Sequence, residues 1–400
     1  MRKIQHRMKR AALAAAFGGL MAAAVLPSAS YADTLRPDVA KPLNDAQTLY
    51  RAHKYKDALG KIAQAAAVPN KTPYETYMVE EMRGAAAMAA GDALTAAQAY
   101  ETLLNSGQLK GEDEQRTTAA LAGIYFQEKN YAKAIAVAQR YLKAGGGDPD
   151  MRTLLVQSYY LSNDCANVVT LLKAGVDAQV KGGRVPDESQ LQLLGTCSQR
   201  VSDSATYRGA LEKLVAFHPK QSYWDDLFAA IRSKPGYSSR LDIDAYRLRR
   251  ATGALSSPDD YMEMTQLAIV ANSTAEAKQV IDQGFASGVL GHDAGADREK
   301  RLQALAAKRA AAPADPANPV APIDAGLNLV YAGKATDGLA MMGAAIAKGG
   351  LDHPDEAQLH LGVAYYVAGQ KAKAVQAFHA VKGTDGSADL ARLWVLAASK

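Results

Sequence analysis

The feature that most constrains the fold of this chain is an internal repeat. Residues 121–135 read LAGIYFQEKNYAKAI, and residues 361–375 repeat the same order of residue types as LGVAYYVAGQKAKAV. Each copy predicts a helix, a short polar turn and a second helix that opens on a small residue. Self-similarity of this kind is typical of stacked helical units, because one unit alone cannot bury its apolar face. The sequence therefore predicts a helical array.

The two copies resemble the tetratricopeptide repeat, in which a large and a small residue precede an aromatic position, and an alanine follows in the second helix. Spacings of 38, 38, 34 and 39 residues separate the second-helix positions of the first five units. The aligned pairs are Leu49 and Ala58, Ala87 and Ala96, Tyr125 and Ala134, Tyr159 and Val168, Ser198 and Tyr207, Leu329 and Gly338, and Tyr365 and Ala374. The resemblance implies an all-α fold, an α-solenoid of antiparallel helical hairpins wound as a right-handed superhelix.

The pattern divides the chain into successive segments. Residues 33–219 hold about five repeat hairpins, and residues 220–310 keep helical periodicity while the repeat pattern decays. We expect helices in that divergent region at residues 223–232, 241–254, 260–271, 275–287 and 294–310. Residues 311–322 carry four prolines among alanines and predict an extended linker. Residues 323–400 predict two more hairpins and a terminal capping helix at 388–399.

The first 32 residues have the pattern of a secretory signal peptide. Five Lys and Arg precede an apolar run over residues 11–26, and a small-x-small site ends at Ala32. This pattern predicts export to the bacterial periplasm, cleavage after Ala32 and no stable membrane insertion afterwards. The segment holds five of the 46 Lys and Arg and none of the 41 Asp and Glu, so the remainder carries 41 of each. That balance gives no support for a nucleic-acid partner.

No sequence motif of an enzyme is present, and we predict no catalytic residue, cofactor or metal. His353, His360 and His379 fall near one another in the last hairpin, but their spacing matches no metal-ligand motif. We therefore expect a non-catalytic scaffold or adaptor of the cell envelope.

An envelope enzyme of the cell-wall lytic type, with its site in residues 220–310, is the alternative. Such an enzyme needs a catalytic carboxylic acid, for which Glu263, Glu276 and Glu299 are the candidates. All three lie in plain helical patterns, and the aromatic-rich groove of such enzymes has no counterpart in the sequence. The sequence therefore favours the scaffold.

The two cysteines predict a disulfide bond in an exported chain. Cys165 is expected to open the second helix of one hairpin, and Cys197 to lie late in the first helix of the next. Antiparallel neighbours place those two ends at the same edge of the array. Two small buried thiols are the alternative.

The concave surface of such an array is lined by the first helices, and this surface is the expected binding face. Aromatic and Met side chains there would anchor an extended or helical peptide. The partners predicted are other proteins or peptides of the cell envelope. Packing within the array is the alternative role for these residues. The position after each aromatic mark reads Tyr50, Met88, Phe126, Tyr160, Gln199, Val330 and Tyr366.

A basic run from Tyr246 to Arg250 forms a second surface candidate, with Arg298, Lys300 and Arg301 downstream. Such a run indicates either a solvated helix face or a docking patch for an acidic partner or glycan.

Overall fold

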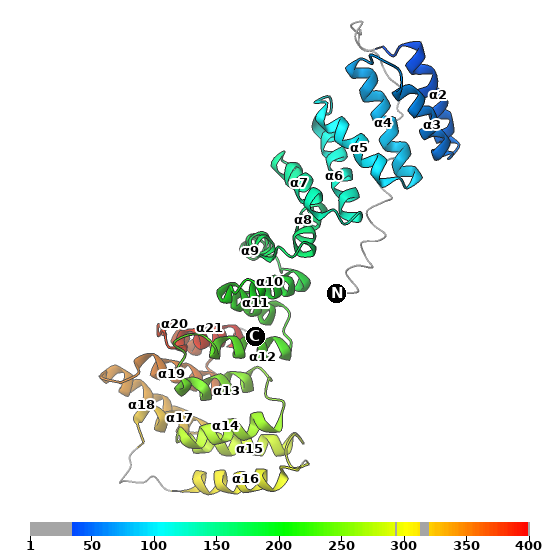
Figure 1. Ribbon diagram of the computed structural model, residues 1–400. Helices are drawn as coiled ribbons and strands as arrows, with labels where there is room; N and C mark the ends of the chain where they lie inside the picture. Colours follow the sequence, from blue (N-terminus) through cyan, green and yellow to red (C-terminus); the bar gives the residue numbers. More distant parts are fainter. Residues whose placement is uncertain (1–33, 293, 313–319, 399–400) are drawn as a thin grey trace. The chain divides into compact units, whose positions relative to one another are not determined.

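The computed structural model describes residues 34–292, 294–312 and 320–398. Over these residues the chain forms twenty α-helices, one short 3-10 helix and no strand (Figure 1). The predicted all-α solenoid of helical hairpins is confirmed. The predicted signal peptide with its cleavage site, and residues 313–319 of the predicted linker, lie outside the described residues.

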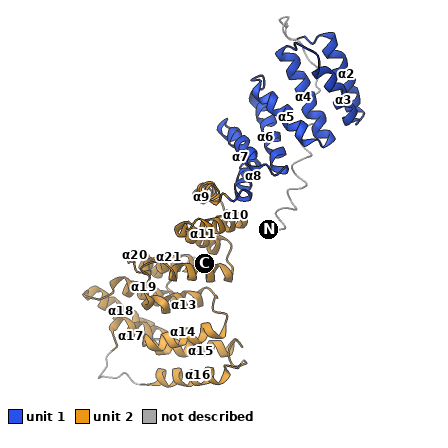
Figure 2. Cartoon of the chain, viewed as in Figure 1, with its two compact units in different colours: residues 1–163 blue, residues 164–400 orange. Residues whose placement is uncertain are grey.

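The chain divides into two compact units, residues 1–163 and 164–400 (Figure 2). This boundary falls inside the repeat block predicted for residues 33–219. The helices of unit 1 are α2 Pro37–Arg51, α3 Tyr55–Ala66, α4 Pro73–Ala90, α5 Ala93–Asn105, α6 Gly111–Gln127, α7 Tyr131–Lys143 and α8 Pro149–Leu161.

Local chemistry begins and ends the helices of unit 1. Thr72 caps α4 in a capping box with Glu75, since each side chain accepts the backbone N–H of the other residue. Gly91 then ends α4 with a φ of 75°, a left-handed conformation that glycine adopts without steric cost. Asp92 accepts from the Thr95 amide and caps α5. The turn of each hairpin is therefore encoded within a few residues.

Small residues let the helices of each hairpin approach closely. Ala58, Ala96 and Ala134, the second-helix positions of the repeat, are fully buried. Gly84 of α4 lies against the ring of Tyr100 of α5, where a Cβ atom would overlap the ring. Within unit 1, α2 packs on α3, α4 on α5 and α6 on α7, and each second helix also packs on the first helix of the next hairpin. Packing between chain neighbours thus builds unit 1.

Unit 2 contains the divergent region and the last repeats. The helices expected in residues 220–310 and the terminal helix all form, with bounds within three residues of the prediction. The elements are α9 Cys165–Lys181, α10 Glu188–Arg200, α11 Ser204–Phe217, α12 Gln221–Arg232, η1 Ser239–Leu241, α13 Asp242–Ala251, α14 Pro258–Val270, α15 Thr274–Ala286, α16 Ala296–Ala311, α17 Pro322–Tyr331, α18 Ala335–Lys348, α19 Pro354–Val367, α20 Lys371–Ala380 and α21 Ser387–Ala398.

The last hairpins of unit 2 fold back onto its middle helices. Helix α17 packs against α15, and α21 packs against α13 (Figure 1). The Ala275 amide donates to Asn328 Oδ1 at 2.9 Å, and Gln279 Nε2 donates to the Tyr331 carbonyl at 2.6 Å. Further along, the Ser238 amide donates to the Asp385 carbonyl at 2.8 Å. Segments about 50 to 150 residues apart in sequence are therefore held together.

A buried ionic network joins these layers. The Arg247 guanidinium of α13 contacts Asp244 Oδ1 at 2.9 Å and Glu276 Oε2 of α15 at 2.8 Å. His360 Nε2 of α19 lies 3.1 Å from Asp244 Oδ2. Burial lowers the pKa of Arg247, but the charges of Glu276 and Asp244 outweigh burial and raise that pKa. Because Arg247 is only 3% exposed, water cannot replace these partners.

Part of the basic run predicted as a surface feature lies in this interior instead. Arg247 belongs to the buried network, and Arg249 binds Asp225 at 3.0 Å and Asp260 at 2.7 Å. The Arg249 guanidinium also lies over the Tyr246 ring, 5.4 Å from its centroid. For Arg247 both surface hypotheses are therefore wrong, and two carboxylates already neutralise Arg249.

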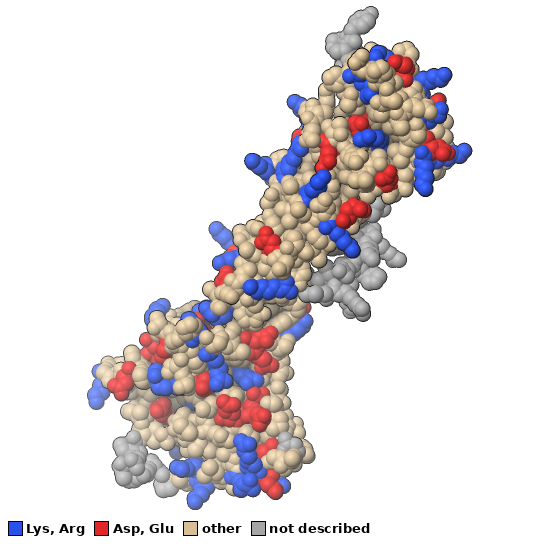
Figure 3. All heavy atoms as spheres, viewed as in Figure 1, with Lys and Arg blue, Asp and Glu red and all other residues tan. Residues whose placement is uncertain are grey.

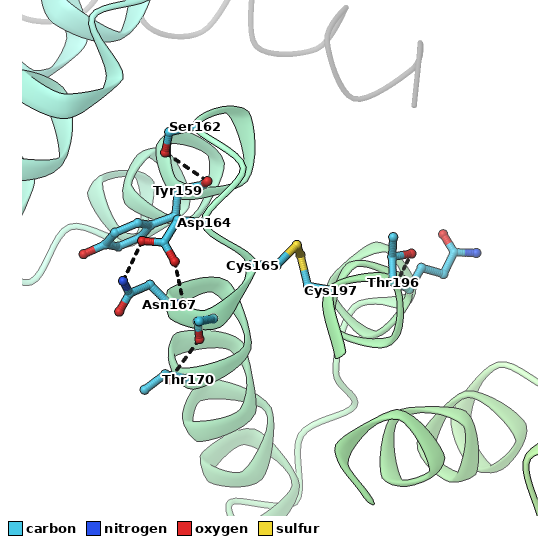
Figure 4. The surroundings of a disulfide bond; sticks show 10 residues. Tyr159, Ser162, Asp164, Cys165, Asn167, Thr170, Thr196 and Cys197 are labelled. Carbon is cyan, nitrogen blue, oxygen red and sulfur yellow. Dashed lines mark hydrogen bonds between the residues drawn. A yellow bond between two sulfur atoms is a disulfide. The ribbon is translucent and has the colours of Figure 1, made fainter. Parts of the chain in front are cut away.

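Cys165 and Cys197 form the predicted disulfide (Figure 4). Cys165 is the first residue of α9, and Cys197 lies in the last turn of α10. Their Cα atoms are 4.9 Å apart. The bond therefore ties together two successive helices at the start of unit 2.

Loss of the disulfide should destabilise unit 2 by about 3–4 kcal/mol, because the bond closes a loop of 32 residues in the unfolded chain. The measurement is denaturant unfolding of the parent chain and of the Cys165→Ala/Cys197→Ala variant, each with and without dithiothreitol. Reductant should lower the stability of the parent to that of the variant and leave the variant unchanged. Equal stability of the oxidised parent and the variant would contradict this account.

Arg247→Met should destabilise unit 2 by about 3–5 kcal/mol, because Asp244 and Glu276 would remain buried without a counter-charge. Denaturant unfolding measures the change. The matched control is Arg250→Met, whose guanidinium hydrogen-bonds Gln283 at an exposed position, with an expected loss below about 1 kcal/mol. Adding Asp244→Asn and Glu276→Gln to Arg247→Met should recover part of the loss. Equal losses in the two Arg variants would refute the role of the network.

The stability of unit 2 should fall as pH rises above about 6.5. Burial lowers the pKa of His360, but the charge of Asp244 and the hydrogen bond to it outweigh burial and raise that pKa above its ordinary 6.5. Protonated His360 therefore stabilises the folded state fully below pH 6.5, and this contribution is lost as pH rises through the folded-state pKa. Among the other charged groups around the imidazole, Glu356 raises its pKa, Arg247 lowers it, and Asp324 Oδ1 lies 3.8 Å from Nδ1.

The measurement is the unfolding free energy as a function of pH for the parent and for His360→Asn. The variant should show a flatter dependence between about pH 6 and 9, whereas His379→Asn, at an exposed position on α20, should keep the slope of the parent. Parallel curves for the parent and His360→Asn would show that His360 does not carry the effect.

Candidate partner-binding face

The candidate face consists of the first helices of unit 1, which are α2, α4, α6 and α8. Helix α2 lies beside α4, and α6 lies beside α8. The predicted residues Tyr50, Met88, Phe126 and Tyr160 come one from each of these helices, and all four are half-buried. Each side chain is therefore held by its neighbours while part of its surface stays accessible.

The aromatic residues of this face are anchored by the turn of their own hairpin. The Tyr50 ring meets the Tyr55 ring edge to face, with centroids 5.3 Å apart. The Phe126 ring meets the Tyr131 ring in the same way at 5.9 Å. Tyr55 and Tyr131 are each the first residue of a second helix, so the two hairpins repeat one arrangement. The rings are therefore positioned before any partner arrives.

Helix α4 adds a methionine surface that the sequence analysis missed. Met78, Met82, Ala85 and Ala89 recur at i, i+4, i+7 and i+11, which places them on one helix face. Met78, Met82 and Met88 are all half-buried and pack against the apolar core of unit 1. This spacing was the signal available in the sequence. Thioether side chains adapt to irregular partners, so this helix suits contact with apolar groups.

Two acidic side chains lie close together near this face. Burial raises the pKa of Glu81 on α4, and the nearby charge of Asp113 at the start of α6 raises it further. Asp113 itself forms an ion pair with Arg116 at 2.8 Å. A site that clamps a carboxylate needs positive charge, whereas Glu81 lies near the negative charge of Asp113.

The predicted residues of unit 2 have different surroundings. Gln199 is exposed in the last turn of α10. Val330 is only 4% exposed and packs against Gly338 of α18, so it offers little surface to a partner. Tyr366 packs edge to face on Trp394 of α21, with ring centroids 5.0 Å apart. The three predicted residues of unit 2 thus differ from one another in exposure and contacts.

The first-helix face of the last hairpins contacts the chain itself. Glu356 and His360 of α19 bind Arg240 of η1 and Asp244 of α13, at 3.2 and 3.1 Å. Tyr331 of α17 is fully buried beside Glu276. Within unit 2, the middle helices therefore cover the first-helix face of the last hairpins. The corresponding face of the first helices in unit 1 is accessible.

The carboxylates of the enzyme alternative are engaged in structural contacts. Glu263 accepts a hydrogen bond from the Tyr246 hydroxyl at 2.7 Å, and Glu276 is paired with Arg247. Glu299 accepts from the Gly291 amide at 2.6 Å and is 3% exposed.

A surface hollow of about 80 Å³ lies in unit 1 between α6 and α7, where it has room for a few waters.

Among the described residues, no group of three or more His, Cys, Asp and Glu is placed to hold a metal ion. None of the described helices combines the length and the apolar character needed to cross a bilayer.

Several solved structures match the chain at low sequence identity. MamA residues 41-end from Desulfovibrio magneticus RS-1 are 16% identical, over 50% of this chain and 99% of that one, with a TM-score of 0.31. The TPR2AB domain of yeast Sti1, in complex with an HSP90 peptide, is 15% identical over 67% of this chain and 98% of that one, with a TM-score of 0.33. Yeast Tom70 is 10% identical over 90% and 95%, with a TM-score of 0.25. No curated protein matches the sequence.

The family comparison agrees with the hairpins seen in the structure. The family described as Tetratricopeptide repeat matches residues 81–149 and 323–389. The first match runs from the second half of α4 to the start of α8, and the second from α17 to the start of α21. The repeat positions in both segments pack as antiparallel helical hairpins with small buried residues at their contacts. These two segments of the chain therefore match the tetratricopeptide repeat.

Proposed function

We propose that this chain is a non-catalytic scaffold of the bacterial cell envelope that binds a protein or peptide through the first-helix face of unit 1. The observation that carries the proposal is the row of half-buried aromatic and Met side chains on α2, α4, α6 and α8. Aromatic side chains anchor partners because they bury large apolar area at little cost in conformational freedom, and the flexible Met thioether adapts to an irregular partner surface. The repeat family itself supports a protein-binding scaffold.

Two features support a location outside the cytoplasm. The disulfide between Cys165 and Cys197 is a bond that persists in oxidising compartments. The basic and apolar pattern of residues 1–32 is that of a secretory signal peptide. The periplasm of a bacterium satisfies both.

The non-catalytic part of the proposal is supported by the fate of the carboxylates in residues 220–310. Glu263, Glu276 and Glu299 each satisfy a hydrogen-bonding or charged group of the fold. A general acid needs access to a substrate, which the buried carboxylates of Glu276 and Glu299 lack, whereas Glu263 is exposed but engaged by the Tyr246 hydroxyl. These contacts disfavour the cell-wall lytic alternative.

The test is affinity capture from native periplasm, followed by titration calorimetry with the purified partner. The variant Tyr50→Ala/Phe126→Ala/Tyr160→Ala removes three anchors from the face. We expect at least a tenfold loss of affinity, because truncation of an interface aromatic typically costs over 1 kcal/mol.

The matched control truncates exposed apolar side chains on second helices, as Leu94→Ala/Leu171→Ala/Val180→Ala. This control should bind like the parent, and circular dichroism should show equal helicity in all three proteins. A partner retained by the aromatic variant and lost by the control would place binding on the second-helix side and overturn the proposed face.

A further inference from the structure

Helix α16 buries one side and exposes the other. Glu299, Leu302 and Ala306 are buried where α16 packs against α14 and α15. The opposite side of the helix faces solvent within the described part of the chain. This exposed half of α16 is the surface considered below.

Five cations lie on this exposed half. They are Arg298, Lys300, Arg301, Lys308 and Arg309. Each of these side chains is exposed, and none has an ion pair or hydrogen bond with another described residue. Asp297 is the one exposed acidic residue of the helix, because Glu299 turns inward to accept the Gly291 amide. In Figure 3, Lys and Arg groups lie along the lower edge of the view, where Figure 1 places α16, with Asp and Glu groups beside them at one end.

The helix period spreads the cations into a strip. Arg301 and Lys308 are two turns apart, roughly 10 Å along the outermost line of the helix. Arg298 and Arg309 fall to one side of that line, and Lys300 falls to the other. The residues between them are small or moderately apolar, and Leu305 is 42% exposed. The surface is therefore broad and cationic, with low side-chain relief.

Among the described residues, no carboxylate pairs with the exposed cations of α16, whereas several cations elsewhere in the chain are paired. Arg140 pairs with Glu114, Arg232 with Asp242, and Arg392 with Glu212. Around α16, Asp282 is already engaged by Lys278 and Gln303. Lys and Arg balance Asp and Glu over residues 33–400, so this positive charge is a local feature. Its field is available to an external anion.

We propose that the exposed face of α16 docks on a bilayer surface rich in anionic headgroups. A plane of diffuse negative charge complements a broad strip of unpaired cations, and Leu305 can enter the headgroup layer between them. An acidic protein segment would instead be expected to meet a groove or a localised pair of cations. Contact of this kind is peripheral, since α16 lies along the surface.

The test uses the full chain with an environment-sensitive dye on Ala304→Cys, at the centre of the exposed half of α16. Labelling is done without reductant, so that the disulfide stays intact. Vesicles of phosphatidylglycerol and phosphatidylcholine at 1:1 should shift the dye emission to the blue at about 50 mM salt, and pure phosphatidylcholine should not. The same dye on Gln98→Cys, exposed on α5, should not respond. This local readout separates contact at α16 from attachment by any other segment.

Charge variants decide whether the cations carry the contact. Arg298→Gln/Arg301→Gln/Lys308→Gln/Arg309→Gln should raise the lipid concentration for half response by roughly 100-fold or more. The matched control removes the same charge from exposed positions of unit 1, as Lys41→Gln/Lys56→Gln/Lys110→Gln/Lys143→Gln, and should change it less than about threefold. No response at residue 304, or equal weakening by both variants, would overturn the proposal. A response to poly-aspartate but not to anionic vesicles would assign the face to an acidic protein instead.

Discussion

The arrangement of unit 2 depends on one buried interaction, the binding of the Arg247 guanidinium by Asp244 and Glu276. Apolar helix faces tolerate small shifts past one another, but a buried charge that loses its partner destabilises the fold by several kcal/mol. His360 extends the network to α19, and the buried Tyr331 beside Glu276 brings in α17. The network therefore favours a single placement of the last hairpins on the middle helices, namely the placement in which every charge of the network is paired.

Unit 1 is held together by contacts of shorter range, such as the ion pair of Arg36 with the buried Glu75, 39 residues apart. Its hairpins pack on chain neighbours through buried alanines and through close contacts such as Gly84 against Tyr100. Nearest-neighbour packing of this kind needs no partner from a distant segment, and it leaves one side of every first helix without a covering layer. The same repeat chemistry thus gives an accessible face in unit 1 and a covered face in the last hairpins of unit 2.

Sequence reasoning succeeded where the signal is local. The repeat positions predicted the hairpins, and helical periodicity located the helices of residues 220–310 within three residues. The folding back of the last hairpins was not predictable, because it depends on pairs such as Asp244 with His360, 116 residues apart. The sequence predicts surface positions for Arg247 and Arg249, because one sequence does not show which charges pair across the fold. Tyr50 and Phe126 were named correctly as first-helix residues of unit 1, yet Val330, in the same repeat register, is buried because Gly338 admits it.

The surroundings of the two kinds of face indicate how each would select a partner. In unit 2 the middle helices meet α17 and α19 mainly through charged and hydrogen-bonding groups, such as Arg240 with Glu356 and Ala275 with Asn328. The accessible face of unit 1 offers aromatic and Met side chains, so apolar contact and shape would carry most of the affinity there. Association driven by apolar contact depends weakly on ionic strength, whereas contact through the unpaired cations of α16 would weaken steeply with salt. Binding at the two proposed surfaces should therefore differ in its dependence on ionic strength, even when both surfaces are engaged in one assembly.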